Sequence, residues 1–267
     1  MEVLKQDYAL VTGATGGLGK AFVFELAKRG YALILTGRSE EKLAALQTSL
    51  LDKYPKTQTH YIAADLCDET QRERLMQTVI ERNLKICLLV NAAGADIQKP
   101  FAAYTQEKIT FQCRANFEAA ASLCHFAIER KSERLEIVNI SSVSGIYPMP
   151  YFAIYSATKG ALTSFSVALR EEMKGKGVAV TAVLPGAMPT REDIKQQIRG
   201  QGLWGRLAAK SPEWVAAYAL KAVSKNKRKV IPGAWNKCMR FFTAWLPQSW
   251  KLKFIAKRWS KISKDAF

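Results

Sequence analysis

The segment that decides the fold class is Tyr8-Ala-Leu-Val-Thr-Gly-Ala-Thr-Gly-Gly-Leu-Gly19. Its first five residues form a short apolar run, a glycine cluster follows directly, and residues 20–29 carry apolar side chains at helical spacing. This order predicts a buried strand, a tight turn and a helix. Because backbone N–H groups at such a turn and the dipole of the following helix favour an anion, the segment also indicates a phosphate-binding loop.

The same alternation of strand and helix continues along the chain. Further strands are expected at residues 32–36, 61–64, 86–90, 136–140, 178–184 and 230–231, which gives seven strands separated by helical stretches. Such an order predicts an α/β fold of three layers, a Rossmann-type doubly wound parallel sheet with helices on both faces. We expect one domain over residues 1–233 and a C-terminal amphipathic helical tail over residues 234–267.

The composition is that of a packed globular chain with an excess of positive charge. Of 267 residues, 48% are hydrophobic and 24% are charged, and the net charge is +17. Residues 221–267 hold thirteen Lys or Arg and one acid, Asp265, so +12 of the charge lies there. Such charge suggests an anionic partner. No nucleic acid is expected as that partner, because the sequence contains no recognition motif and the charge is confined to the tail.

Cysteine and histidine usage argues against a disulfide scaffold and against a metal site. The five cysteines are scattered without a Cys-x-x-Cys pair, which favours reduced thiols. The only histidines, His60 and His125, have no partner at ligand spacing. The sequence also shows no apolar stretch of membrane-spanning length and no leader, so we expect a cytoplasmic protein.

The residues after the second expected strand indicate which dinucleotide binds. An acidic residue there would accept hydrogen bonds from a free ribose 2′-hydroxyl, but the sequence has Gly37-Arg38-Ser39. An arginine at this place pairs with a 2′-phosphate, so the prediction is NADP, with NAD as the alternative. The competing interpretation of Arg38 is a solvated charge at the start of a helix.

Two further strand ends carry residues that suit a nucleotide. Asp65, after the third strand, suits a contact to the adenine amino group, and it suits a cap of the following helix equally well. The run Asn91-Ala92-Ala93-Gly94, after the fourth strand, places small residues where the backbone passes beneath a ligand.

A tyrosine and a lysine one helical turn apart indicate acid–base chemistry. Tyr155 and Lys159 lie in a segment of helical period over residues 151–174, so both side chains project from one face. A nearby ammonium is expected to lower the pKa of the phenol from its ordinary value near 10. Ser142 follows the end of the fifth strand, at the edge of the sheet where ligands bind.

Together these residues resemble the classical short-chain dehydrogenase/reductase family. The resemblance covers residues 8 to about 190 and rests on six motifs in order: TGATGGLG at 12–19, NAAG at 91–94, Asn116, ISS at 140–142, YSATK at 155–159 and PGAMPT at 185–190. The chain departs from the family pattern in having NAAG for NNAG, and Gly16 where some NADP users have a basic residue.

The resemblance implies a role for each matching residue. Tyr155 would exchange a proton with the substrate oxygen, Ser142 would hold that oxygen, Lys159 would bind the nicotinamide ribose, and Asn116 would anchor a water in a proton relay. Hydride transfer would run between nicotinamide C4 and a carbonyl carbon. The implied cofactor-binding set is Gly13, Thr15, Gly16, Gly17, Leu18, Gly19, Arg38, Ser39, Asp65, Leu66, Asn91, Ala92, Gly94, Tyr155, Lys159, Pro185, Gly186 and Thr190.

The substrate side is expected to be apolar. The family builds a substrate lid at about residues 186–215, where Gly200, Gly202 and Gly205 surround Leu203 and Trp204. A second wall is expected from Tyr147, Met149, Tyr151 and Phe152. These side chains favour a hydrophobic ketone or its secondary alcohol, such as a 3-oxoacyl, steroid or bile-acid compound. The alternative function is an NADP-binding regulatory or membrane-surface protein with little catalysis.

The tail has the period of two amphipathic helices interleaved with basic residues. Their apolar stripes are Trp235, Cys238, Met239, Phe242 and Leu246, and then Leu252, Ile255, Trp259 and Ile262. Packing against the enzyme body or a partner subunit would explain the stripes, and so would peripheral contact with a membrane. By resemblance to the family, a homodimer or homotetramer is expected.

Overall fold

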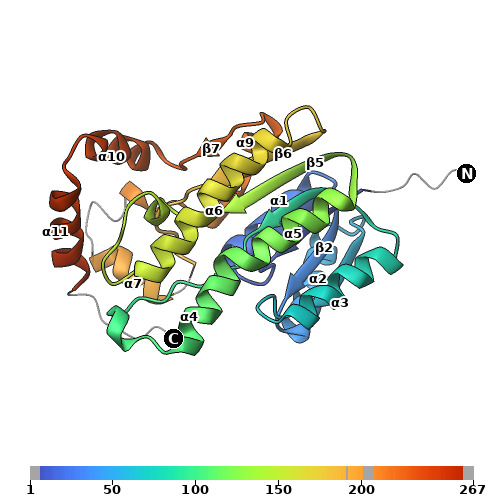
Figure 1. The fold of residues 1–267 in the computed structure, drawn as a ribbon. Coiled ribbons are helices and arrows are strands. Elements are labelled where there is room, and N and C mark those ends of the chain that lie inside the picture. The colour runs from blue at the N-terminus through green and yellow to red at the C-terminus, as the bar shows by residue number, and fades with distance from the viewer. Residues whose placement is uncertain (1–6, 191, 201–206, 261–267) are drawn as a thin grey trace, which may run out of the picture.

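The fold is built on one parallel sheet of seven strands in the order β3-β2-β1-β4-β5-β6-β7 (Figure 1). The computed structural model describes residues 7–190, 192–200 and 207–260. The strands are β1 (Asp7–Thr12), β2 (Ala32–Gly37), β3 (Thr59–Ala63), β4 (Lys85–Asn91), β5 (Lys131–Ile140), β6 (Val178–Val183) and β7 (Lys229–Val230). The predicted doubly wound α/β fold and the number of strands are confirmed.

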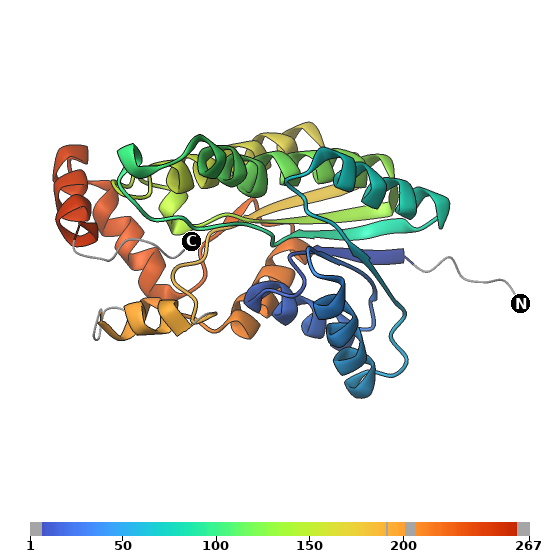
Figure 2. The same ribbon diagram turned by 90° about the horizontal axis from the view of Figure 1, so that it is seen from below.

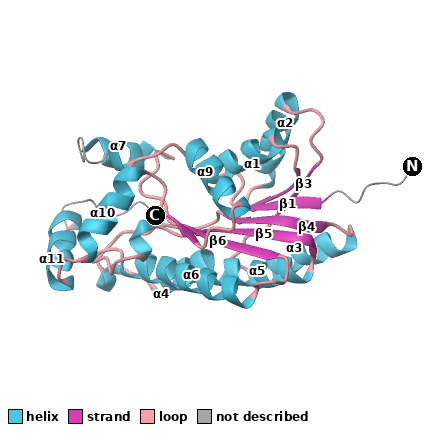
Figure 3. Cartoon of the chain, turned by 90° about the horizontal axis from the view of Figure 1, so that it is seen from above, coloured by secondary structure: helices cyan, strands magenta, loops and turns pink. Residues whose placement is uncertain are grey.

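Helices cover both faces of the sheet, as Figure 3 shows. On one face lie α1 (Gly17–Lys28), α2 (Glu40–Lys53) and α9 (Pro212–Ser224). On the other lie α3 (Glu69–Glu81), α4 (Gln106–Cys113), α5 (Ala119–Glu129) and α6 (Ala153–Glu172). Each layer has its own apolar core against the sheet, one around Phe22 and Leu43 and the other around Leu75 and Leu123.

The sequence explains where several of these helices begin. Ser39, Asp68, Thr105 and Ser211 each accept a hydrogen bond from a backbone N–H in the first turn of the helix that follows. Such caps satisfy backbone donors that the helix itself leaves without a partner. The helix α1 is different, because its cap residue Gly16 has no side chain to offer.

The tail forms two helices at one end of the molecule, α10 (Ala234–Ala244) and α11 (Gln248–Trp259). Figures 1 and 2 both place them at the end opposite the amino terminus, beyond the carboxyl ends of the strands. The short helix α7 (Glu192–Gly200) lies at the same end. Within the described residues, no helix combines the length and apolar character needed to cross a bilayer.

Candidate active site

A cavity of about 620 Å³ opens at the edge of the sheet where the strands end. Its walls come from the segments directly after β1, β4, β5 and β6, from the start of α6, and from α10 and α11. Because all the strands are parallel, their carboxyl ends meet at this edge, and ligands of open α/β sheets bind there. The sequence-predicted residues in the wall are Gly13, Gly16, Gly17, Leu18, Gly19, Ala92, Gly94, Ser142, Tyr155, Lys159, Pro185, Gly186 and Thr190.

The glycine turn leaves no room for side chains. Gly13 has a φ of +60°, and a Cβ there would lie 2.9 Å from Ala93 Cα, in the segment after β4. A Cβ at Gly17 would lie 2.8 Å from the side chain of Thr190, in the segment after β6. Only glycine avoids both the backbone strain and the contact. The turn therefore brings the ends of three strands close together around one wall of the cavity.

The residues predicted to contact the adenosine part of the cofactor lie outside this cavity wall, after β2 and β3. Arg38 is exposed and forms no ion pair with any residue that the structure describes. Ser39 Oγ accepts a hydrogen bond from Lys42 N at 3.2 Å, so this hydroxyl caps α2. Thr15 lies close to Gly37, where a Cβ would be 3.4 Å from Thr15 Oγ1. The guanidinium of Arg38 is thus available to an anion from solvent.

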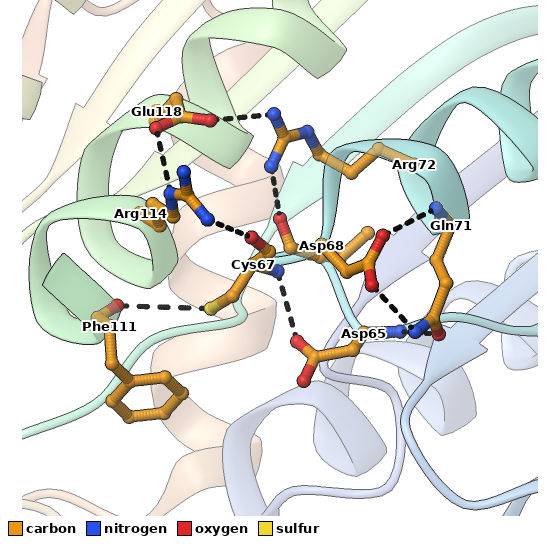
Figure 4. A network of polar contacts seen from close by, with 9 residues as sticks. Asp65, Cys67, Asp68, Gln71, Arg72, Phe111, Arg114 and Glu118 are labelled. Carbon is orange, nitrogen blue, oxygen red and sulfur yellow. Dashed lines mark hydrogen bonds and ion pairs between the residues drawn. The ribbon is translucent and has the colours of Figure 1, made fainter. Parts of the chain in front are cut away.

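A polar network fixes the loop that contains Asp65 (Figure 4). Asp65 Oδ1 accepts a hydrogen bond from Cys67 N at 2.9 Å, while Asp68 accepts one from Gln71 N and caps α3. The capping role that the sequence left open for Asp65 is therefore wrong. Leu66 O accepts a hydrogen bond from Arg72 at 2.7 Å, and Arg72 is paired with Glu118 at 2.6 Å.

Asn91 points away from the cavity. Its Nδ2 donates to Asn139 Oδ1 at 2.8 Å and lies near Ala120 O and Cys124 Sγ of α5, behind the sheet. Its side chain holds the end of β4 in place. Gly94, three residues later, faces Lys159, and a Cβ there would lie 3.1 Å from Lys159 Nζ.

Ser142, Tyr155 and Lys159 meet on one side of the cavity. The Tyr155 side chain is hydrogen-bonded to that of Ser142. Lys159 is buried, donates to Ile140 O at 2.9 Å, and its Nζ lies 5.9 Å from the centre of the Tyr155 ring. The end of β5 and the first two turns of α6 therefore place a hydroxyl, a phenol and an amine together.

Asn116 is buried one layer behind these three residues, in a π-helical turn (Arg114–Glu118) between α4 and α5. Its Oδ1 accepts from Ala95 N at 2.8 Å, and its Nδ2 donates to Ala95 O at 2.9 Å and to Thr158 Oγ1 at 3.2 Å. Asn116 thereby connects the segment after β4 to α6. π-turns are frequent at functional sites, and this one sets the position of the amide.

Burial dominates the electrostatics of the phenol and the amine. Burial, together with the Asp96 carboxylate, raises the pKa of Tyr155 to about 12, and the hydrogen bond with Ser142 opposes both effects. Burial lowers the pKa of Lys159 to about 8, against the opposing effect of Asp96. The sequence led us to expect a lowered tyrosine pKa. That direction is wrong for the free protein, because desolvation of the phenolate and the Asp96 carboxylate both raise the pKa of Tyr155.

The substrate side of the cavity is largely apolar. Of the four side chains expected there, Tyr147, Met149 and Phe152 line the cavity, but Tyr151 does not. Tyr151 has a φ of +66°, and its carbonyl accepts a hydrogen bond from Lys99 N at 3.0 Å. The expected lid tip at residues 201–206 lies outside the described residues.

The tail lines part of the cavity, a role that the sequence did not reveal. The lining residues come from α10 and α11: Asn236, Met239, Arg240, Thr243, Ile255 and Trp259. Tyr147 and Thr243 share a hydrogen bond of 2.6 Å, and the Phe152 and Trp259 rings meet edge to face with centres 4.9 Å apart. Asp96 is a further wall residue that no motif indicated. An apolar period predicts a helix, but it carries no signal that the helix closes a cavity.

The stripe expected on α10 is divided between two faces of the helix, because Trp235 and Met239 are half-buried and Met239 lines the cavity. Phe242 is 61% exposed, Leu246 is 43% exposed and Cys238 is also exposed. Beside Met239, the cavity side of α10 carries the polar residues Asn236 and Thr243, which hydrogen-bond to Ala208 O and to Tyr147. On α11 the expected inward residues Leu252, Ile255 and Trp259 are half-buried, and Ile262 lies outside the described residues.

The residues present fit a nicotinamide dinucleotide. At Gly13 and Gly94 an added Cβ would collide with neighbouring backbone or side-chain atoms, so the cradle needs glycine. The start of α1 has no side-chain cap and no acidic residue in its first turn, which leaves it suited to a phosphate. Within the described residues, no group of His, Cys, Asp and Glu is arranged to hold a metal ion.

Comparison with known proteins decides the family. A family model described as short chain dehydrogenase matches residues 7–199. The chain belongs to the short-chain dehydrogenase family. The family match confirms the expected family, the oxidoreductase class and the nicotinamide cofactor of this short-chain dehydrogenase.

Individual relatives and one solved structure are similar over most of the chain. The dehydrogenase is 34% identical to a very-long-chain 3-oxoacyl-CoA reductase from Bos taurus over 83% of this chain and 70% of the relative. It is 31% identical to an inactive hydroxysteroid dehydrogenase-like protein 1 from Homo sapiens, over 92% of this chain and 75% of the relative. A solved short-chain dehydrogenase from Sphingobium yanoikuyae in complex with NADPH superimposes with a TM-score of 0.73 at 26% identity, covering 91% and 97% of the two chains.

Proposed function

We propose that this short-chain dehydrogenase reduces a hydrophobic ketone to its secondary alcohol with NADPH. The observation that carries the proposal is the single cavity in which Ser142, Tyr155 and Lys159 lie between the glycine turn and an apolar wall. The substrate classes that suit this wall are a 3-oxoacyl chain and a steroid or bile-acid ketone. Two relatives are named for such compounds, a 3-oxoacyl-CoA reductase and a hydroxysteroid dehydrogenase-like protein.

The cavity residues divide the chemistry among them. When bound, the reduced nicotinamide supplies a hydride to the carbonyl carbon. Ser142 donates a hydrogen bond to the carbonyl oxygen, and Tyr155 gives that oxygen its proton as the alkoxide forms. Lys159 holds the cofactor ribose, and Asn116 keeps the segment after β4 against α6. The phenol of Tyr155 is protonated at neutral pH, and its raised pKa extends that form to higher pH, which suits reduction.

Replacing Tyr155 with phenylalanine tests the reaction. The variant keeps the ring and loses the proton donor, so we expect the turnover of ketones to fall about 10³-fold. Binding of NADPH, followed by its fluorescence, should stay within about threefold of wild type. The assay is a panel of ketones and alcohols followed at the nicotinamide absorbance with NADPH and with NADH. Unchanged turnover in the variant would refute the assignment.

Arg38 supports NADPH as the cofactor, because its exposed guanidinium follows the carboxyl end of β2 and has no ion-pair partner in the described structure. For Arg38→Ala we expect the KM for NADPH to rise about tenfold or more, since a charge-assisted hydrogen bond is lost. The KM for NADH should not change, which makes NADH the control. Equal KM values for the two cofactors in wild type would contradict this preference.

A second function is a cofactor-binding regulatory protein with little catalysis. The observation that favours it is the human relative whose name includes the word inactive. The retained Ser142, Tyr155, Lys159 and Asn116 argue against it. NADPH binding without turnover of any ketone in the panel would support it.

We also propose that the protein is cytoplasmic and forms a homodimer or homotetramer. Light scattering after size exclusion would identify the oligomeric state.

A further inference from the structure

The two tail helices expose an unusual concentration of large apolar side chains. Of the ten such side chains exposed in the described part of the chain, six lie between residues 241 and 254. They are Phe241 (65% exposed), Phe242 (61%), Trp245 (83%), Leu246 (43%), Trp250 (67%) and Phe254 (69%), and together we call them the aromatic face. Scattered apolar side chains are normal on a surface, whereas a concentration of them marks an interaction site.

The aromatic face is held outward by contacts on the opposite side of both helices. In α10, Asn236 donates to Ala208 O and Pro232 O, and Thr243 bonds to Tyr147. In α11, Trp259 packs on Phe152, and the Lys251 ammonium lies 5.5 Å from the centre of the Tyr147 ring. The inner faces therefore already contact the cavity, and the aromatic face is left for a partner outside the fold.

The charge of the same segment identifies the chemistry of that partner. Residues 234–260 contain six Lys or Arg and no Asp or Glu. The exposed basic residues Lys237, Lys253 and Lys257 flank or alternate with the aromatic side chains in the sequence. Tryptophan and phenylalanine beside lysine and arginine, on a helix without acids, are typical of helices that lie in the interface of an anionic membrane.

We propose that α10 and α11 form a membrane-docking surface that binds anionic lipid through the aromatic face. A second copy of this chain suits the surface less well, because it would bring the same positive charge against it. A bilayer satisfies both features, since anionic headgroups pair with the lysines while the aromatic side chains enter the boundary with the acyl chains.

The docking surface also adjoins the cavity. The same two helices that carry the aromatic face supply Met239, Ile255 and Trp259 to the cavity wall. A membrane-dissolved ketone would therefore meet the enzyme at the helices that close its substrate side. This delivery step rests on the proposed reductase function, whereas the docking itself does not depend on it.

The docking is tested by sedimentation of the full chain with vesicles. We expect binding to phosphatidylcholine vesicles that contain roughly one-third phosphatidylglycerol, and about tenfold weaker binding to phosphatidylcholine alone. The triple variant Trp245→Ser, Trp250→Ser and Phe254→Ser should bind the anionic vesicles about tenfold or more weakly. The matched control is Trp214→Ser in α9, which removes an exposed tryptophan elsewhere and should bind as wild type does.

Other results would overturn the proposal. Absence of binding to anionic vesicles at low salt would do so, and so would unchanged binding by the triple variant. A wild-type oligomer that the triple variant converts to a monomer would identify the aromatic face as a contact between copies. Capture of an acidic carrier protein in preference to vesicles would likewise replace the membrane as partner. A chain that binds vesicles and turns over no ketone would refute only the proposed reaction.

Discussion

Asp96 adds a carboxylate to the cavity beside the pair of Tyr155 and Lys159. Its side chain lines the cavity, and its negative charge raises the pKa of both Tyr155 and Lys159. A carboxylate at this place stabilises the neutral phenol and the ammonium together. It thus keeps a proton on each group that the reduction needs protonated.

Replacing Asp96 with asparagine removes the charge and keeps the shape of the side chain. We expect the pKa values of both Lys159 and Tyr155 to fall, so the alkaline limb of the pH profile for ketone reduction should move to lower pH. The sign follows because reduction needs both groups protonated, and Lys159, with a pKa of about 8, loses its proton first as the pH rises. The control is Glu171→Gln, which removes an exposed carboxylate near the other end of α6. A profile that moves to higher pH, or does not move, would contradict this role for Asp96.

At the scale of elements, apolar runs predicted the strands well where both faces of the sheet are buried. The first half of β5 escaped prediction, because residues 131–134 are polar; of these, Lys131 pairs with Ile86 of β4, and the register then shifts before Glu136 pairs with Leu88. The π-turn around Asn116 has no sequence signature, since it differs from an α-helix only in its hydrogen-bond spacing. The residues proposed to be catalytic follow motifs with fixed spacing, but the wall from α10 and α11 depends on long-range packing that a local pattern does not encode.

Asn236 is the element-scale contact that holds α10 against the catalytic body. Its Nδ2 donates to Ala208 O at 3.1 Å and to Pro232 O at 2.9 Å, and it lies beside Gly186. For Asn236→Ala we expect the free energy of unfolding to fall by about 1–3 kcal/mol, because two carbonyl oxygens lose their donor. The KM for a bulky ketone should rise as α10 loosens. Denaturant titration and steady-state kinetics measure the two effects, with the exposed Gln248→Ala as control. A variant equal to wild type in both would show that α10 is held by other contacts.

At the scale of the whole molecule, the substrate wall and the apolar cores are separate. The three core clusters of the described chain contain no residue from α10 or α11, although both helices line the cavity. A chain that ends at Pro247 should therefore keep the sheet and the cofactor site while losing Ile255 and Trp259 from the substrate wall. We expect its kcat/KM for a bulky ketone to fall about tenfold or more, because two large apolar contacts disappear.

The comparison that checks this separation is between a bulky and a small ketone. For a small ketone, kcat/KM should stay within about threefold, since such a substrate does not reach the missing wall. The affinity for NADPH, followed by fluorescence, should not change, because none of the predicted cofactor residues lies beyond Thr190. An equal loss for both ketones would mean that α11 supports the catalytic residues themselves. No loss for either would mean that the described wall does not contact the substrate.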